Sequence, residues 1–242
     1  EADRMLDIGF RPAIEKILRR CPKDRQTMLL SATLPPEIQR LTQRYLEDPV
    51  HINCSNKQVS VETIEQRYFS VAQDQKFNTL ISLLERETPR QAIIFCRTKR
   101  GTDRLHLAIQ KKLKGIAPLA DARLACIHGD MNQRERDRVF GELRSGKINI
   151  LVATDVVGRG IDVSTVSHII NYDIPLDCDD YVHRVGRTGR MGREGIAFTF
   201  VTADEGPQLT AIEANINLLL ERDSLGTEPV EPVVEEPQVE VA

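Results

Sequence analysis

Hydrophobic positions along the middle of the chain form short, nearly continuous apolar runs separated by stretches with helical spacing. The runs are Ala92–Cys96, Leu124–Ile127, Ile148–Ala153, His168–Asn171 and Ile196–Val201. Patterns typical of helices, such as Thr102–Leu113 and Gln133–Leu143, lie between them. Continuous apolar strands that alternate with helices indicate a parallel sheet buried on both faces. We therefore predict an α/β fold.

The first fifty residues show one strand and two helices. Apolar residues at helical spacing predict a helix over Arg11–Arg20, which ends at Cys21-Pro22. Thr27–Leu30 is predicted to form a short strand, and Pro35-Pro36 opens a second helix that runs through Tyr45. Because this is too little for an independent domain, we expect the end of a domain that starts before residue 1.

Composition divides the chain into four predicted parts. Residues 1–52 are the remnant of a first domain, the polar residues 53–62 a linker, residues 63–221 the main α/β domain, and residues 222–242 a tail. From Gly226 onward the tail repeats Pro and Glu without an apolar pattern, so we expect disorder. A solvating role is favoured for this acidic tail over the recruitment of a protein partner.

Composition and charge are those of a soluble globular protein. Of the 242 residues, 40% are hydrophobic and 29% charged, and no apolar run approaches the roughly 20 residues that span a bilayer. The five cysteines form no C-x-x-C pair, which argues against zinc and disulfides and favours a reducing cytoplasmic location. Residues 221–242 hold seven Asp or Glu and one Arg, a net charge of −6. Because the whole chain has a net charge of −3, residues 1–220 carry +3. A mildly basic body is compatible with a nucleic-acid partner.

Polar residues collect directly after the predicted strands. These clusters are Ser31-Ala32-Thr33, Arg97–Arg100, His128–Asp130 and Thr154-Asp155. In an open parallel sheet the carboxyl ends of the strands meet at one edge, and ligands bind there. We therefore predict that this edge is the working surface. Individual residues also have simpler interpretations: Thr98 and Asp130 are reasonable caps for the helices that follow, and Asp155 has the same alternative.

The stretch Tyr181–Arg190, Y-V-H-R-V-G-R-T-G-R, contains Arg184, Arg187 and Arg190 at three-residue spacing. On a helical turn this spacing puts neighbouring side chains on nearly one face, and the interleaved glycines remove bulk near a ligand. Guanidinium groups keep their charge and fit phosphate oxygens two at a time. The pattern predicts a clamp on a polyphosphate; a basic patch or a set of salt bridges is the alternative. For His183 and His128, the alternative to a functional role is that each is a hydrogen-bonded histidine of the core.

One apparent phosphate loop is excluded. Gly141–Lys147 matches the pattern G-x-x-x-x-G-K, but Ile148 stands where Ser or Thr should hold magnesium. The segment also ends a predicted helix and leads into a strand, which is the reverse of a phosphate loop. Gly146 is therefore predicted to cap the helix.

Taken together, these motifs resemble those of the DEAD-box RNA helicases over nearly all of residues 1–201. Glu1-Ala2-Asp3 resembles the end of the motif that names the family, Ser31-Ala32-Thr33 its S-A-T motif, Ala153–Asp162 its fifth motif and His183–Arg190 its sixth. The resemblance implies a RecA-like parallel sheet flanked by helices, preceded by the tail end of a first RecA-like domain. It also implies the C-terminal part of an ATP-dependent RNA helicase, which couples ATP binding and hydrolysis to local unwinding of RNA duplexes.

The resemblance implies roles in hydrolysis for residues of the first domain. Glu1 would be the general base for the attacking water, and Asp3 would bond to the hydroxyls of Ser31 and Thr33. In the family, the Mg²⁺-organising Asp, the phosphate loop and the adenine-reading segment all precede the position of residue 1. This chain alone is therefore expected not to hydrolyse ATP, although its parent protein should.

The resemblance also implies ligand contacts in the main domain. Arg187 and Arg190 would be arginine fingers on the γ-phosphate, Asp162 would hold the ATP ribose, and Arg159 would pair across the cleft with an acidic motif. Contacts to the RNA sugar-phosphate backbone would come from Arg97 or Thr98, Gly129, Arg136 and Thr154. Such contacts give affinity without sequence preference.

Two other functions compete with an RNA helicase. A DNA-directed relative would share most motifs, but the sixth motif begins with His183, whereas relatives with a D-E-A-H motif usually begin it with Gln. A non-catalytic RNA clamp would not need Arg187 and Arg190 as ligands for a γ-phosphate. The RNA helicase is therefore favoured over both.

Overall fold

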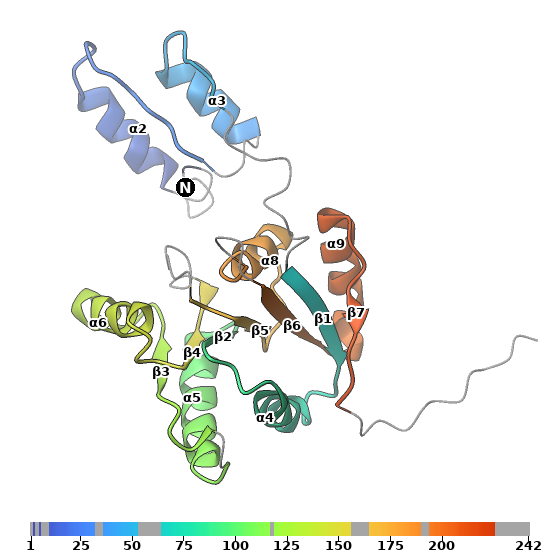
Figure 1. Cartoon of the computed structure of the whole chain (residues 1–242). Helices are drawn as coiled ribbons and strands as arrows, with labels where there is room; N and C mark the ends of the chain where they lie inside the picture. The colour runs from blue at the N-terminus through green and yellow to red at the C-terminus, as the bar shows by residue number, and fades with distance from the viewer. Residues whose placement is uncertain are drawn as a thin grey trace, which may run out of the picture. The chain divides into compact units, whose positions relative to one another are not determined.

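The computed structural model describes residues 2, 5, 10–31, 36–52, 64–116, 119–155, 165–189 and 194–225 (Figure 1). The chain forms two compact units, Glu1–Val59 and Ser60–Ala242. The described helices are α2 (Arg11–Arg20), α3 (Pro36–Tyr45), α4 (Lys76–Glu87), α5 (Lys99–Leu113), α6 (Gln133–Arg144), α8 (Cys178–Val185), α9 (Gly206–Ile216) and the short 3-10 helix η4 (Ala203–Glu205). The described strands are β1 (Ile64–Ser70), β2 (Ala92–Phe95), β3 (Leu124–Ile127), β4 (Ile150–Ala153), β5 (His168–Asn171), β6 (Gly195–Val201) and β7 (Glu221–Arg222). None of these helices combines the length and apolar character that a membrane span requires.

The first unit contains the two predicted helices, α2 and α3, around a small apolar cluster. Ile38 and Leu41 of α3 are buried, and Ile14 of α2 and Tyr45 pack against them. Both helices begin with a proline in the first turn, where the missing N–H costs no hydrogen bond. The periodicity of these segments was therefore sufficient to predict the helices.

The strand predicted over Thr27–Leu30 is wrong. This segment forms no strand, and Met28 and Leu30 are 73% and 70% exposed. A β-strand requires a ladder of hydrogen bonds to a neighbouring strand, and the described part of the first unit contains none. One backbone bond, from the Ala2 N–H to the Leu30 carbonyl at 3.1 Å, holds the segment beside the start of the chain.

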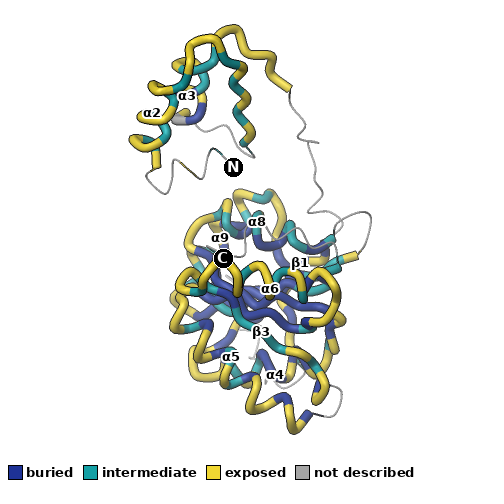
Figure 2. Tube along the Cα trace, turned by 90° about the vertical axis from the view of Figure 1, so that its left-hand side faces the viewer, coloured by how far each residue is buried: buried dark blue, intermediate teal, exposed yellow. Residues whose placement is uncertain are grey.

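The second unit is built on a seven-stranded sheet with the order β3-β4-β2-β5-β6-β1-β7. All of its strand pairs are parallel, as predicted from the continuous apolar runs. Helices α4 and α5 cover one face and α6, α8 and α9 cover the other (Figure 1). The central strands are buried on both sides (Figure 2). A parallel α/β sheet flanked by helices is thereby confirmed.

Successive residues of the strands supply the two halves of the core. Ile94 and Phe198 pack on the side of α4 and α5, whereas their neighbours Phe95 and Ala197 pack on the opposite side. Side chains of a strand alternate between faces, so an apolar residue at every position is needed to bury both. This explains why the sequence shows unbroken apolar runs instead of alternation.

The ordered body continues beyond residue 221, the predicted end of the main domain. Arg222 belongs to β7, and the backbone N–H of Asp223 donates to the Tyr68 carbonyl at 2.8 Å. The Asp223 side chain is 6% exposed and lies 2.7 Å from Arg86 and 3.4 Å from Arg67. The predicted tail therefore begins too early, and its residues 226–242 lie outside the described part of the chain.

Asp223 is expected to make stability depend on acidic pH. Its burial acts to raise the carboxyl pKa, but the hydrogen bonds and charges of Arg86 and Arg67 outweigh it and lower the pKa. Because the folded pKa lies below the unfolded value of about 3.9, the carboxylate stabilises the fold at higher pH. This contribution is lost as pH falls through the folded pKa. Asp223→Asn should therefore flatten the acid limb of the melting temperature measured from pH 7 to about pH 3.

The exposed Asp121 provides the control for this measurement. Asp121→Asn should leave the acid limb unchanged. An acid limb in Asp223→Asn parallel to that of the unmodified chain would contradict the assigned role of the Arg86 and Arg67 pairs.

The segment that imitates a phosphate loop forms the turn between α6 and β4. Gly146 has a φ of +72°, and its N–H donates to the Leu143 carbonyl at 3.0 Å. The left-handed conformation favours glycine and ends the helix here. The predicted capping role of Gly146 is confirmed.

Candidate functional site

The predicted polar edge follows from the register of three neighbouring strands. Ala153 at the end of β4 is aligned with Phe95 of β2 on one side and Ile127 of β3 on the other. The Cys96 N–H donates to the Ala153 carbonyl at 2.9 Å, and the Thr154 N–H donates to the Ile127 carbonyl at 3.3 Å. The residues that follow these strands therefore lie side by side at the carboxyl edge of the sheet.

Two loops of this edge are tied together through the start of α5. Thr98 is the N-cap of α5, where its hydroxyl accepts the Gly101 N–H at 3.0 Å, as predicted. The next residue, Lys99, forms an ion pair with Asp130 at 2.7 Å. The hydrogen bond and charge of Lys99 lower the pKa of that carboxyl, so Asp130 stays ionised. The loops after β2 and β3 are thus joined by opposite charges.

The predicted cap at Asp130 is wrong, because α6 begins two residues later than that assignment requires. Asn132 is the N-cap, and its side chain accepts the Glu135 N–H at 3.0 Å. The Glu135 carboxylate accepts the Asn132 N–H in return at 3.2 Å. This reciprocal pair satisfies two donors at the helix end, which leaves Asp130 available to Lys99.

Gly129 and Arg136 lie together on the exposed side of this edge. The Arg136 guanidinium donates to the Gly129 carbonyl, and its Nε is buried without a hydrogen-bond partner among the described residues. A Cβ atom added at Gly129 would meet no atom within 4 Å. The packing of the described chain therefore does not require a glycine here. Thr98, Gly129 and the buried Thr154 follow β2, β3 and β4, and Arg136 reaches Gly129 from α6.

The side chain of Arg97 is held by an acidic residue and a carbonyl of the chain. The Arg97 guanidinium lies 2.9 Å from Glu205 and 3.3 Å from the Ile174 carbonyl. The backbone N–H of Arg97 donates to the Asp173 carboxylate at 2.9 Å. Beneath it, the fully buried Lys76 lies 3.6 Å from Asp173 and 3.5 Å from Glu205. The backbone N–H of Arg97 is thus fixed at the end of β2.

The network of Lys76, Asp173 and Glu205 was not predicted from the sequence. Burial acts to raise the pKa of Glu205, but the Thr202 N–H, Lys76 and Arg97 outweigh it and lower the pKa. The charged form of Glu205 is therefore favoured between two cations. No local motif marks these residues, because they are about 30 to 130 positions apart in the chain and meet only in the folded structure.

Arg184, the first of the three spaced arginines, is an internal structural residue. Its side chain is 3% exposed, and two of its nitrogens donate to the Asp155 carboxylate, one of them at 2.7 Å. The remaining nitrogen donates to Asn171 at 3.1 Å and to the Asp173 carbonyl at 2.7 Å. The predicted clamp of three arginines is therefore wrong for Arg184, and its salt-bridge alternative is correct. Asp155 is the partner of this arginine.

Arg187 lies in the turn after α8, where its Nε donates to the His183 carbonyl at 3.1 Å. The helix ends at Val185, and Gly189 has a φ of +67°, so helical spacing does not continue through the motif. The next residue, Thr188, is buried, and its hydroxyl donates to the two carbonyls that precede β5, at 2.7 and 3.1 Å. Arg187 is therefore anchored on both sides and lies toward the amino end of β5.

Six predicted site residues lie outside the described part of the chain. They are Glu1, Asp3, Thr33, Arg159, Asp162 and Arg190. Ser31 is described and half-buried. The 3.1 Å bond from the Ala2 N–H to the Leu30 carbonyl places Ala2 beside the residue that precedes Ser31.

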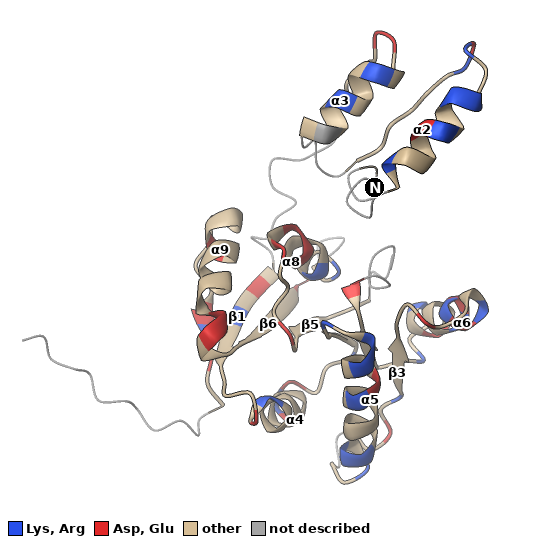
Figure 3. Ribbon diagram, turned by 180° about the vertical axis from the view of Figure 1, so that it is seen from behind, with Lys and Arg blue, Asp and Glu red and all other residues tan. Residues whose placement is uncertain are grey.

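Helix α5 adds positive charge next to the clustered residues. Its fifteen residues contain five Lys or Arg and one Asp, and Figure 3 shows the basic positions along its length. Basic side chains near a surface attract phosphates without regard to base sequence. This edge can therefore attract a polyanion.

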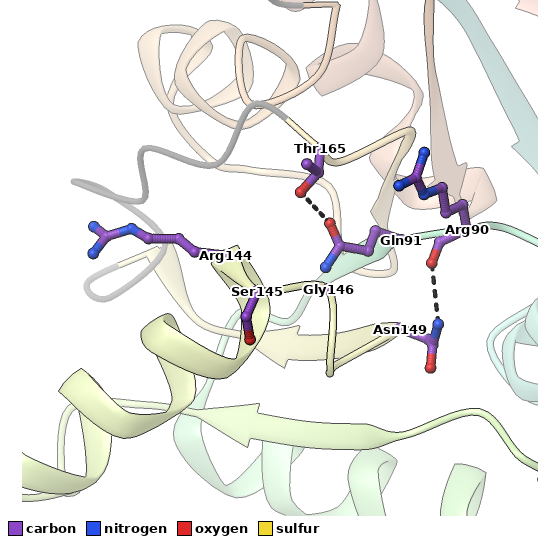
Figure 4. A pocket seen from close by; sticks show the side chains of 7 residues that line it. All are labelled: Arg90, Gln91, Arg144, Ser145, Gly146, Asn149 and Thr165. Carbon is purple, nitrogen blue, oxygen red and sulfur yellow. Dashed lines mark hydrogen bonds between the residues drawn. The ribbon is translucent and has the colours of Figure 1, made fainter.

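A separate pocket opens at the opposite, amino edge of the sheet (Figure 4). Its central residue, Gln91, donates to the carbonyls of Leu143 and Ile148 at 2.7 and 2.8 Å and accepts a hydrogen bond from Thr165. Asn149 donates to the Arg90 carbonyl at 3.2 Å. These amide groups connect the segments that precede the strands, and this is a structural role.

Two family models match the chain. The model of the helicase conserved C-terminal domain matches residues 75–192, and that of the DEAD/DEAH box helicase matches residues 1–41. The chain is 43% identical over 222 residues to the DEAD-box ATP-dependent RNA helicase CshA of Bacillus subtilis. This match covers 92% of the chain and 43% of the relative, so the chain spans less than half the length of that protein.

Solved structures show the same similarity. S. cerevisiae Dbp5 bound to RNA and ADP BeF3 matches 93% of this chain and 58% of its own, with 32% identity and a TM-score of 0.81. The C-terminal domain of the DEAD-box protein Dbp5 matches 67% of this chain and 91% of its own, with 33% identity and a TM-score of 0.60. The parallel sheet and its flanking helices are thus those of a RecA-like domain.

Proposed function

Because the chain belongs to the DEAD-box family of RNA helicases, we propose that it is the C-terminal part of an ATP-dependent enzyme that unwinds or remodels short RNA duplexes. The observation that carries this proposal is the arrangement of Thr98, Gly129 and Thr154 after three adjacent strands, with Arg136 of α6 bonded to Gly129. The basic helix α5 lies beside them. This surface suits a sugar-phosphate backbone, and one solved relative is bound to RNA.

RNA would be held through backbone groups and a few side chains. Gly129 is exposed, so a phosphate can approach its main chain, and Arg136 is already oriented by the Gly129 carbonyl. The Arg97 side chain is bonded to Glu205, so we assign the contact after β2 to Thr98 and its exposed loop. The Lys76 network would hold that loop in position.

ATP and Mg²⁺ are the cofactors that the family implies, and ATP hydrolysis would supply the free energy for remodelling. Among the spaced arginines, Arg187 fits a γ-phosphate ligand, because it is half-buried and its Nε is fixed by the His183 carbonyl. Arg190, Asp162 and Arg159 stay predicted ligands of the nucleotide. Mg²⁺ would be held mainly by the part of the helicase that the family places before residue 1.

The Ala2–Leu30 bond supports coupling between the two motifs of the first unit. We assign Glu1 to activation of the attacking water, and Asp3 to hydrogen bonds with the hydroxyls of Ser31 and Thr33. A structural change at the bound nucleotide would then reach the S-A-T segment through the hydrogen bonds of Asp3. The described cysteines are free, which fits the predicted cytoplasmic location.

ATP turnover by a parent protein that includes the preceding helicase domain tests the proposal. Single-stranded RNA should stimulate turnover, and DNA of matched length and sequence should stimulate it far less. Equal stimulation by DNA would favour a DNA-directed relative. Turnover that neither nucleic acid stimulates, together with intact RNA binding, would favour an RNA clamp.

A further inference from the structure

Three side chains of the kinds that bind zinc meet between β3 and α5. Cys126 of β3 faces the side of the sheet that α5 covers, and His128 directly follows the strand, two residues further on. Asp103 comes from the first part of α5, which packs on that side. One potential ligand atom from each residue lies within 4.8 Å of the other two. Thiolate sulfur, imidazole nitrogen and carboxylate oxygen are all ligands of Zn²⁺.

The position of the cluster suits a metal that enters from solvent. Strand β3 is at the edge of the sheet, and the Asp103 side chain is 52% exposed. His128 is 13% exposed, and its Nε2 lies 3.0 Å from Asp103 Oδ1. Its Nδ1 is buried without a hydrogen-bond partner among the described residues. The imidazole is thus oriented by the carboxylate, while the chain leaves its second nitrogen unsatisfied.

The Asp103 carboxylate is available to a cation despite the basic residues of α5. The nearby Lys99 is paired with Asp130 on the adjoining loop, so its ammonium group is not bonded to Asp103. The Asp103 carboxylate beside Cys126 supplies the negative charge that a divalent cation needs.

We propose that Asp103, Cys126 and His128 form a three-ligand site for Zn²⁺, with a fourth position open to water. Binding forms one bond from the metal to each side chain and releases the Cys126 proton to solvent. The absence of a C-x-x-C pair does not exclude such a site, because its ligands come from a strand and a helix. The site requires neither ATP nor RNA, so its test is independent of the proposed helicase function.

Cobalt is the spectroscopic probe for this site, and zinc is the competitor. The tag-free 242-residue chain should bind one Co²⁺ with visible bands of tetrahedral geometry and a thiolate-to-cobalt charge-transfer band. Zn²⁺ should displace the cobalt and raise the melting temperature, and a chelator should reverse that rise. Cys126→Ser should abolish the charge-transfer band. Asp103→Asn should weaken zinc binding at least about tenfold.

Matched controls come from residues outside the cluster. Cys178→Ser removes another free thiol, and His106→Asn removes an imidazole one turn from Asp103 on α5. Both variants should bind cobalt like the unmodified chain. The proposal is overturned if the unmodified chain gives no charge-transfer band, or if Cys126→Ser keeps it. It is also overturned if Asp103→Asn, a change at an exposed helix position, binds zinc with unchanged affinity.

Discussion

Replacing Arg187 with alanine is expected to lower RNA-stimulated ATP turnover of the parent helicase by about a thousandfold or more. The guanidinium would stabilise the charge that develops on the transferred γ-phosphoryl group, and alanine leaves that charge without a ligand. Arg187 is held by the His183 carbonyl and is followed by the anchored Thr188. Its position is therefore preorganised. Steady-state turnover at saturating RNA measures the effect.

RNA affinity separates this role from a general loss of structure. Without ATP, Arg187→Ala should bind single-stranded RNA nearly as tightly as the unmodified protein. Arg187→Lys should have little more turnover than Arg187→Ala, because an ammonium group cannot bind two phosphate oxygens in a plane. Arg144→Ala, which removes an arginine at the end of α6, should leave turnover unchanged. An Arg187→Ala variant with full turnover would refute the proposed finger.

The helices and strands of the second unit were predictable because their buried positions are apolar and follow the spacing of each kind of element. The helix expected over Gln133–Leu143 extends by one residue, to Arg144, and the strand Leu124–Ile127 has the predicted bounds. The strand expected from Ile148 begins at Ile150. Ile148 is buried, but it lies in the turn before the strand, and its carbonyl accepts a hydrogen bond from Gln91. Burial alone does not distinguish a strand from the turn that leads into it.

The direction in which a charged side chain points was not predictable from the sequence. Arg184 and Arg187 share a motif, yet Arg184 turns into the protein because Asp155 and Asn171 supply partners there. These partners are 29 and 13 positions away, and no local pattern connects them. In the same way, only the tertiary structure shows that Glu205 holds Arg97. The spacing along the sequence identified the arginines as candidates. Hydrogen bonds and ion pairs with residues distant in the sequence determine what each arginine does.

Arg184→Met is expected to destabilise the second unit by about 3 kcal/mol, the lower end of the usual cost of breaking a buried ion pair, because the Asp155 side chain is 24% exposed. Methionine fills much of the same space, so the loss reflects polar groups more than a cavity. The Asp155 carboxylate would lose both of its guanidinium donors, and the Asn171 oxygen and Asp173 carbonyl would each lose one. The guanidinium also lies 5.0 Å from the centre of the Phe95 ring, and that contact would be lost. Urea unfolding monitored by circular dichroism gives the change in free energy.

Two further variants identify the ion pair as the cause. Arg138→Met makes the same substitution at an exposed position of α6 and should change the free energy of unfolding by less than about 0.5 kcal/mol. Asp155→Leu combined with Arg184→Met should cost less than the sum of the two single changes, because neither charge is then left buried alone. Strict additivity would instead mean that Arg184 stabilises the fold through its packing. The buried pair ties the end of β4 to α8, and through α8 to the turn that carries Arg187. Its loss is therefore expected to disturb both the predicted RNA surface and the predicted nucleotide ligand.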